Sequence, residues 1–225
     1  LIDADNFSAT YLPLVIREAS ALGTTTVKRV YGNFADTSTN AWNPLVVDHA
    51  MSPVHVPPPV KQKNSSDIKI VIEAMDLLHR GQIEGFCIAS SDSDFTTLAS
   101  RIREDGIRVF GFGEEKATKA YINSFDRFFY CDLLLRDERS GDLAKPTRTP
   151  SLPMKQILAA IDDVSGEDKW AHLGEVGSTL VKRMPDFDHR NFGYKKLSDL
   201  IQSITTLEVQ RSKVGTGTLV QVRRK

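Results

Sequence analysis

The 225-residue sequence predicts an α/β fold, in which a parallel sheet is flanked by helices, followed by a small winged-helix (helix-turn-helix) domain. The parallel sheet is predicted because short apolar runs alternate with segments of helical apolar spacing through the first 135 residues. The winged helix is predicted because helix-like segments near the C-terminal end precede two β-like segments joined by a Gly-bearing turn.

The strands expected in the first domain are short and apolar, with β-branched or aromatic residues in most of them. They cover residues 1–4, 24–32, 85–90, 107–112 and 127–131. The segment 52–66 is rich in proline and is expected to be a loop or an edge segment, because proline has no backbone N–H to donate to a sheet.

The helices expected between these strands carry apolar residues three and four positions apart. They cover residues 8–22, 67–80, 94–104 and 114–123, and the segment 40–51 has room for a short helix around Trp42. Gly23, Gly81 and Gly106 follow three of these helices, as is typical of helix ends. Strands that alternate with helices in this way require right-handed crossovers between parallel neighbours.

A polar stretch over residues 136–150 is predicted to link two domains, 1–135 and 151–225. The second domain is expected to contain helices over 152–164, 172–184 and 192–204. Two strands, 207–213 and 218–224, follow on either side of the turn at 214–217. Helices followed by such a hairpin are typical of a winged helix.

The charges are unevenly distributed although the whole chain is neutral. Residues 1–146 contain 16 Lys and Arg against 20 Asp and Glu, and residues 147–225 contain 13 against 9. The acidic part suits a cation site and the basic part suits a phosphate-facing module. Cys87 and Cys131 are expected to be reduced core residues, which indicates a cytoplasmic protein. No apolar run approaches the ~20 residues that span a membrane, so no membrane partner is expected.

Acidic residues follow the strands at one predicted edge of the sheet. Asp3 and Asn6 come at the end of the first strand, and Asp92 and Asp94 follow the strand at 85–90. Asp67 opens a helix that is expected to begin at the same edge. Because ligands of open parallel sheets bind beyond the carboxyl ends of the strands, these side chains are expected to converge.

Converging carboxylates repel one another unless a cation joins them. With no His or Cys nearby they select a hard metal, Mg²⁺ or Mn²⁺, which acidifies a bound water and neutralises charge on a phosphodiester. Each acid also has a simpler role open to it: Asp67 and Asp94 suit helix caps, and Asp5 and Asp92 suit turns. Asp3 fits such a role less well, because it lies in an apolar strand where an unpaired carboxylate is costly.

Three motifs resemble those of NYN domains, the PIN-like nucleases with a Rossmann-like sheet. They are Leu-Ile-Asp3-Ala-Asp-Asn6, Lys63-Asn-Ser-Ser-Asp67 and Ala89-Ser-Ser-Asp92-Ser-Asp94-Phe95. The resemblance implies that Asp3, Asp67, Asp92 and Asp94 bind the catalytic metal, with Asn6 as a polar neighbour that orients an acid or contacts phosphate. Asp5 and Asp76 are less certain members of the site.

The segment 186–201, with its Phe192-Gly-Tyr194-Lys-Lys-Leu197 stretch, resembles the core motif of OST-HTH (LOTUS) winged-helix domains. Arg190, Tyr194, Lys195 and Lys196 are the candidate RNA contacts, because cations bind phosphates and tyrosine stacks on bases. The alternative is a solvated helix end with Tyr194 packed into the core. LOTUS modules also have protein partners, so a docking role stays open.

Together these observations predict a divalent-metal-dependent ribonuclease with a C-terminal RNA-binding module. The first alternative is a catalytically weak RNA-binding adaptor whose LOTUS domain docks RNA or a protein. The second is a phosphatase or small-nucleotide hydrolase, which would share the acids but not an RNA-binding type of C-terminal domain. Nothing in the sequence selects RNA over DNA, since no 2′-hydroxyl contact is identifiable.

Overall fold

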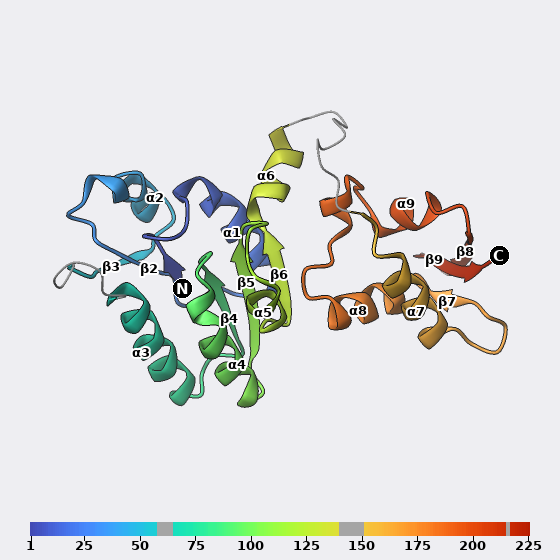
Figure 1. Cartoon of the computed structure of the whole chain (residues 1–225), viewed down its shortest axis with the longest axis horizontal. Helices are drawn as coiled ribbons and strands as arrows, with labels where there is room; N and C mark the ends of the chain where they lie inside the picture. Colours follow the sequence, from blue (N-terminus) through green and yellow to red (C-terminus); the bar gives the residue numbers. More distant parts are fainter. Residues whose placement is uncertain (58–64, 140–150, 215–216) are drawn as a thin grey trace. The chain divides into compact units, whose positions relative to one another are not determined.

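The computed structural model describes residues 1–57, 65–139, 151–214 and 217–225 (Figure 1). The chain divides into two compact units, Leu1–Leu135 and Arg136–Lys225, which are described separately. None of the helices in these ranges has the length and apolarity that crossing a membrane requires.

The first unit contains a six-stranded sheet in the order β3-β2-β1-β4-β5-β6, and every neighbouring pair is parallel. The predicted parallel α/β fold is therefore confirmed. The strands are β1 (Ile2–Asp3), β2 (Arg29–Gly32), β3 (Ser52–His55), β4 (Gly85–Ala89), β5 (Arg108–Gly113) and β6 (Arg127–Tyr130). The proline-rich segment contributes β3, which lies at one edge of the sheet as expected for a strand that contains proline.

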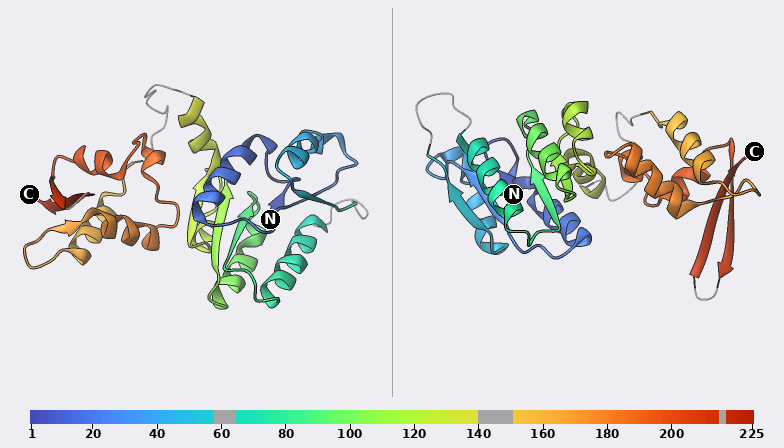
Figure 2. Two further views of the ribbon diagram at one scale, coloured as in Figure 1. Left: turned by 180° about the vertical axis from the view of Figure 1, so that it is seen from behind. Right: turned by 90° about the horizontal axis from the view of Figure 1, so that it is seen from below.

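Helices cover both faces of this sheet (Figure 2). One apolar core packs α1 (Leu12–Leu22), α2 (Trp42–Asp48) and α6 (Cys131–Arg139) against the sheet. The other core packs α3 (Ser65–His79), α4 (Thr96–Glu104) and α5 (Lys119–Asn123). Both faces are buried, which explains why the strands read as apolar runs and not as alternating patterns.

Several predicted boundaries in the first unit were wrong. The second strand begins at Arg29 and not at residue 24, because Arg29 pairs with Ser52, the first residue of β3, so residues 24–28 precede the neighbouring strand. The helix expected from residue 114 begins at Lys119, because the Thr118 side chain accepts a hydrogen bond from the Tyr121 backbone N–H and caps it there. The helix expected over 94–104 starts instead as a 3₁₀ turn, η3 (Ser93–Phe95), followed by α4.

The stretch expected to be a linker from residue 136 begins as helix. α6 extends from Cys131 to Arg139, and Cys131 and Leu134 are buried at helical spacing. The remainder of that stretch, 140–150, lies outside the described residues.

The second unit contains α7 (Met154–Val164), α8 (Leu173–Arg183) and α9 (Leu197–Gln202) with an antiparallel sheet in the order β7-β9-β8. The strands are β7 (Ala171–His172), β8 (Leu207–Val214) and β9 (Gly217–Arg224). Helices followed by a β8–β9 hairpin form the predicted winged helix. The predicted start of the helix at residue 192 was wrong. A 3₁₀ turn, η4 (His189–Phe192), ends at Gly193 with φ 79°, and α9 begins only at Leu197.

Candidate metal centre and RNA-contact surface

The centre of the first unit's sheet has the geometry of a ligand site. From β1 the strand order runs outwards through β2 and β3 on one side and through β4, β5 and β6 on the other. The connections therefore leave β1 and β4 in opposite directions, and open α/β sheets bind ligands in the crevice at such a reversal. Asp3 ends β1, and the acidic loop after Ala89 ends β4.

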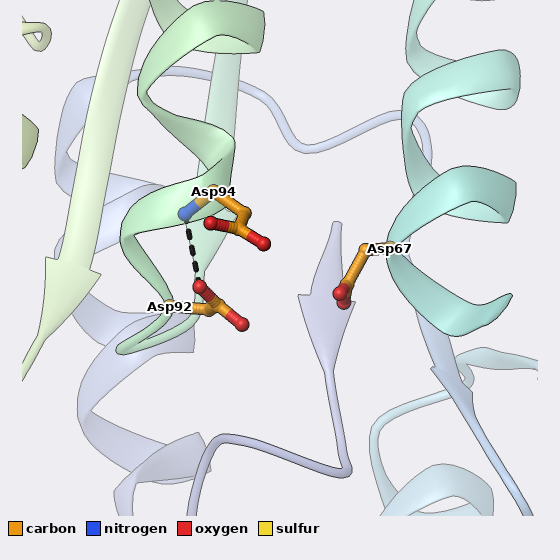
Figure 3. Close-up of side chains that lie close together, drawn as sticks. All are labelled: Asp67, Asp92 and Asp94. Carbon is orange, nitrogen blue, oxygen red and sulfur yellow. Dashed lines mark hydrogen bonds between the residues drawn. The ribbon is translucent and has the colours of Figure 1, made fainter. Parts of the chain in front are cut away.

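Three carboxylates meet beyond these strand ends. One oxygen from each of Asp67, Asp92 and Asp94 can be chosen so that all three lie within 4.8 Å of one another. Figure 3 shows Asp67, in the first turn of α3, facing Asp92 and Asp94 across the end of a strand. Asp67 is buried, Asp92 is half-buried and Asp94 is exposed, so the group opens to solvent on one side.

Local structure fixes the direction of the Asp92 carboxylate. Asp92 caps the η3 turn, and its Oδ1 accepts the Asp94 backbone N–H at 2.9 Å. The Asp92 N–H in turn donates to the Ser90 Oγ at 3.0 Å. Asp92 and not Asp94 is therefore the capping residue here, and a capping role is compatible with a ligand role because only its Oδ1 accepts the Asp94 N–H.

The electrostatics of the group favour a cation. Burial, followed by the charges of Asp3, Asp92, Asp94 and Asp5, raises the pKa of Asp67 to about 6. Asp67 is only 8% exposed, and its Oδ1 has no hydrogen-bond partner among the described residues. A buried carboxylate oxygen without a donor is destabilising, and a hard divalent cation relieves both this and the mutual repulsion. These residues therefore fit Mg²⁺ or Mn²⁺.

Asp3 lies outside the three-carboxylate group and is occupied by hydrogen bonds. Its Oδ1 accepts the backbone N–H groups of Asp5 and Asn6, and its Oδ2 accepts the Asn6 Nδ2 at 3.0 Å and the Ser90 Oγ at 2.8 Å. Burial raises the pKa of Asp3, while the hydrogen bonds from Ser90 and Asn6 oppose that rise. Asn6 thus orients Asp3, and Asp3 reaches Asp92 through Ser90.

Sequence reasoning missed the serines that connect these acids. Ser90 is fully buried, donates to Asp3 and accepts from Asp92, and its carbonyl accepts the Tyr121 hydroxyl at 3.2 Å. Ser66 donates to Asp5 at 2.8 Å. The available signal was position alone, because each serine lies one or two residues before an acid of the group. Asp76, one of the less certain candidate acids, is exposed on α3.

The candidate RNA contacts of the second unit differ in their exposure and in their partners. Arg190 is held by Asp188, whose carboxylate accepts the Arg190 Nε at 3.0 Å and Nη2 at 2.8 Å. Tyr194 is half-buried and packs against the apolar core. Lys195 and Lys196 are exposed in the loop before α9. Of this set, only the two lysines are therefore exposed.

Two family models match the chain, one for each unit. The model described as NYN domain matches residues 1–135, more than half of the chain. The chain belongs to the NYN domain family. NYN domains are PIN-like nucleases, so the first unit is a domain of a nuclease family. The model described as OST-HTH/LOTUS domain matches residues 148–218, and domains of this kind bind RNA. Both resemblances found in the sequence are confirmed.

Solved structures with some similarity cover parts of this NYN chain. An uncharacterized protein of Nitrosomonas europaea is 38% identical with a TM-score of 0.33, covering 37% of this chain and 84% of that one. A protein of unknown function from Vibrio parahaemolyticus is 16% identical with a TM-score of 0.48, covering 56% and 87%. A fragment of a Chromobacterium violaceum protein is 33% identical with a TM-score of 0.29, covering 35% and 86%. No curated protein matches the chain.

Proposed function

We propose that this NYN protein is a divalent-metal-dependent ribonuclease whose C-terminal module holds the RNA substrate. The observation that carries the proposal is the meeting of Asp67, Asp92 and Asp94 at the reversal of strand order, where the buried Asp67 Oδ1 has no donor among the described residues. A nuclease-family domain joined to an RNA-binding type of module supports RNA as the substrate.

In this proposal Asp67, Asp92 and Asp94 hold Mg²⁺ or Mn²⁺. The ion supplies charge neutralisation at a phosphodiester and lowers the pKa of a coordinated water. Asp3, with both oxygens already accepting hydrogen bonds, adds negative charge behind the group and holds Ser90 in place. Asn6 orients Asp3 through its side-chain hydrogen bond, and its exposed position leaves it beside an incoming phosphate.

The exposed lysines Lys195 and Lys196 are proposed to bind phosphates of the RNA. Arg190 and Tyr194 are proposed to shape that loop, because the first is bound by Asp188 and the second is packed against the core. The two free cysteines support a reducing, cytoplasmic environment for the protein.

The activity is tested with labelled single-stranded RNA and Mn²⁺. Asp92→Asn should reduce cleavage by about 100-fold or more, because an amide still caps η3 but removes one negative ligand. EDTA should abolish cleavage. Asp76→Asn, which removes an exposed acid elsewhere on α3, is the matched control and should cleave normally. Cleavage that survives EDTA and Asp92→Asn would refute the proposal.

An RNA-binding adaptor without cleavage is the second candidate. The observation that favours it is the saturation of Asp3 by hydrogen bonds, which leaves three acids in the group. An adaptor would bind RNA with a strong salt dependence and leave the RNA length unchanged in Mn²⁺. The same RNA sample, run on a denaturing gel and in a filter-binding assay, separates the two candidates.

A further inference from the structure

The three-carboxylate group depends on two elements that are far apart in the sequence. Asp92 and Asp94 lie in and beside the η3 turn after β4, whereas Asp67 lies in the first turn of α3. A metal tolerates only small errors in ligand position, so some contact must fix the distance between these elements. α3 contacts η3 directly, and it also contacts β1, the strand that pairs with β4, so the end of β1 is a second place where such a contact can form.

The last residue of β1 and the segment after it contact both elements through serine hydroxyls. Asp3 accepts the Ser90 hydroxyl at 2.8 Å, and Ser90 binds the Asp92 N–H. Asp5 accepts the Ser66 hydroxyl at 2.8 Å through its Oδ2, and Ser66 directly precedes Asp67. Two carboxylates only two residues apart thus bind a serine next to each side of the metal-binding group.

Asp5 is itself fixed in position. Its Oδ1 accepts the Asn33 N–H at 3.3 Å, and its own N–H donates to Asp3. Gly32, at the end of β2, leaves the space that Asp5 occupies, because a Cβ there would lie 3.1 Å from the Asp5 Oδ1. On the other side of the contact Ser66 is buried, with 9% exposed, whereas Asp5 is exposed, so the hydrogen bond between them is partly buried.

We propose that Asp5 is a positioning residue that sets the place of Asp67 in the metal site by binding Ser66. This inference rests on the proposed function and adds a residue that acts on the metal through α3. A hydrogen bond to a carboxylate is stronger than one between neutral groups, which suits a contact that must hold the first turn of a helix. Loss of a residue that orients a metal ligand typically reduces metal affinity 10–100-fold.

The test measures the dissociation constant of Mn²⁺ for the full chain by electron paramagnetic resonance of the free ion. Ser66→Ala should raise the Kd about 10-fold, and Asp5→Ala should raise it by about as much. The double variant should have a Kd no higher than that of either single variant, because both substitutions remove the same hydrogen bond. Asp5→Asn, which keeps an acceptor oxygen, should fall between the wild type and Asp5→Ala.

Two control variants separate the loss of this contact from the general loss of a hydroxyl or a charge. Ser100→Ala removes an exposed helical serine on α4, and Asp76→Asn removes a charge on α3; both should bind Mn²⁺ like the wild type. Circular dichroism shows whether each variant is folded, and Asp5→Asn carries the test if Asp5→Ala unfolds.

The possible results distinguish this inference from the proposed function. If Ser66→Ala binds Mn²⁺ with the wild-type Kd, the inference is wrong. That result combined with loss of binding in Asp5→Ala would make Asp5 a direct ligand. If the wild type binds no Mn²⁺ at all, the proposed function fails and the inference fails with it.

Discussion

Asp67 and Asp188 are both buried aspartates, one in each unit, but their surroundings differ. Asp188 accepts hydrogen bonds from Arg190, and its Oδ1 lies 3.2 Å from the His189 Nδ1. Burial opposes its ionisation, yet the hydrogen bonds from His189 and Arg190 and the charge of Arg190 hold the pKa of Asp188 well below its usual range. Asp67 has a raised pKa and an oxygen without a donor in the described chain.

The difference teaches how a structural acid and a ligand-binding acid are distinguished. Asp188 has its cation supplied by the fold, so its charge stabilises the second unit. Asp67 is surrounded by other acids, so its charge destabilises the first unit until a cation arrives. Both side chains are buried, so their different partners distinguish the two roles.

The largest effect is expected from removing the structural acid. Asp188→Ala should lower the free energy of unfolding of the second unit by about 3 kcal/mol, because it removes a buried carboxylate that is paired with the Arg190 guanidinium. Differential scanning calorimetry gives the change, and hydrogen exchange assigns it to a unit. An unchanged second unit would show that Asp188 contributes nothing to its stability.

Replacing the ligand-binding acid Asp67 is expected to have the opposite effect on stability. In EDTA at pH 7.5, Asp67→Asn should raise the free energy of unfolding of the first unit by up to about 3 kcal/mol, because the amide carries no charge. Mn²⁺ should raise the Tm of the wild type and leave that of Asp67→Asn nearly unchanged. A destabilised Asp67→Asn in EDTA would contradict the assignment.

The two acids should also give the units different pH dependences. The raised pKa of Asp67 means that its protonated form stabilises the fold. That contribution is full below about pH 3.9, the usual value for an aspartate, and is lost as the pH rises to about 6. The lowered pKa of Asp188 means that its stabilisation is full above about pH 3.9 and is lost only as the pH falls below that value.

These directions are measured without any metal. When the pH is lowered from 7 to 5 in EDTA, the free energy of unfolding of the first unit should rise because Asp67 becomes protonated. Asp188 should not change the free energy of unfolding of the second unit over this range. Hydrogen exchange of the wild type and Asp67→Asn across this range isolates the Asp67 contribution. A first unit whose pH dependence is the same in both proteins would break the comparison.

The smallest effect is expected on the RNA-contact loop of the second unit. Lys195→Ala with Lys196→Ala should weaken RNA binding several-fold and reduce the slope of log K against log salt by about 1.4 for a single strand. Lys155→Ala, at an exposed position on α7, is the control. Equal losses in the control would mean that general charge, and not this loop, binds RNA.

Much of the fold follows from patterns along the sequence. Alternating apolar runs and helical segments predicted the parallel sheet, and the confirmed strand order brings the ends of β1 and β4 together. The boundaries were less accurate, because a strand needs neighbours and a helix needs a cap. Residues 24–28 have β-like composition but precede the paired part of β3, and Gly193 delays α9 through a left-handed backbone.

The candidate site, like the fold, could be predicted from the sequence only in part. Topology was enough to expect Asp67, Asp92 and Asp94 near one another, since all three lie close to strand ends or helix starts at one edge. The hydrogen bonds of Ser66 and Ser90 could not be predicted, because a serine hydroxyl binds whichever acceptor the packing places beside it. For the same reason, the hydrogen bonds from Arg190 to Asp188 could not be predicted.

The most direct measurement is anomalous diffraction from a crystal of the full chain soaked in Mn²⁺. We expect a peak within ligand distance, ~2–2.3 Å, of oxygens of Asp67, Asp92 and Asp94, and no such peak in Asp67→Asn. A wild-type crystal that shows no peak there in saturating Mn²⁺, with Asp67 hydrogen-bonded to protein or water in its place, would contradict the metal site.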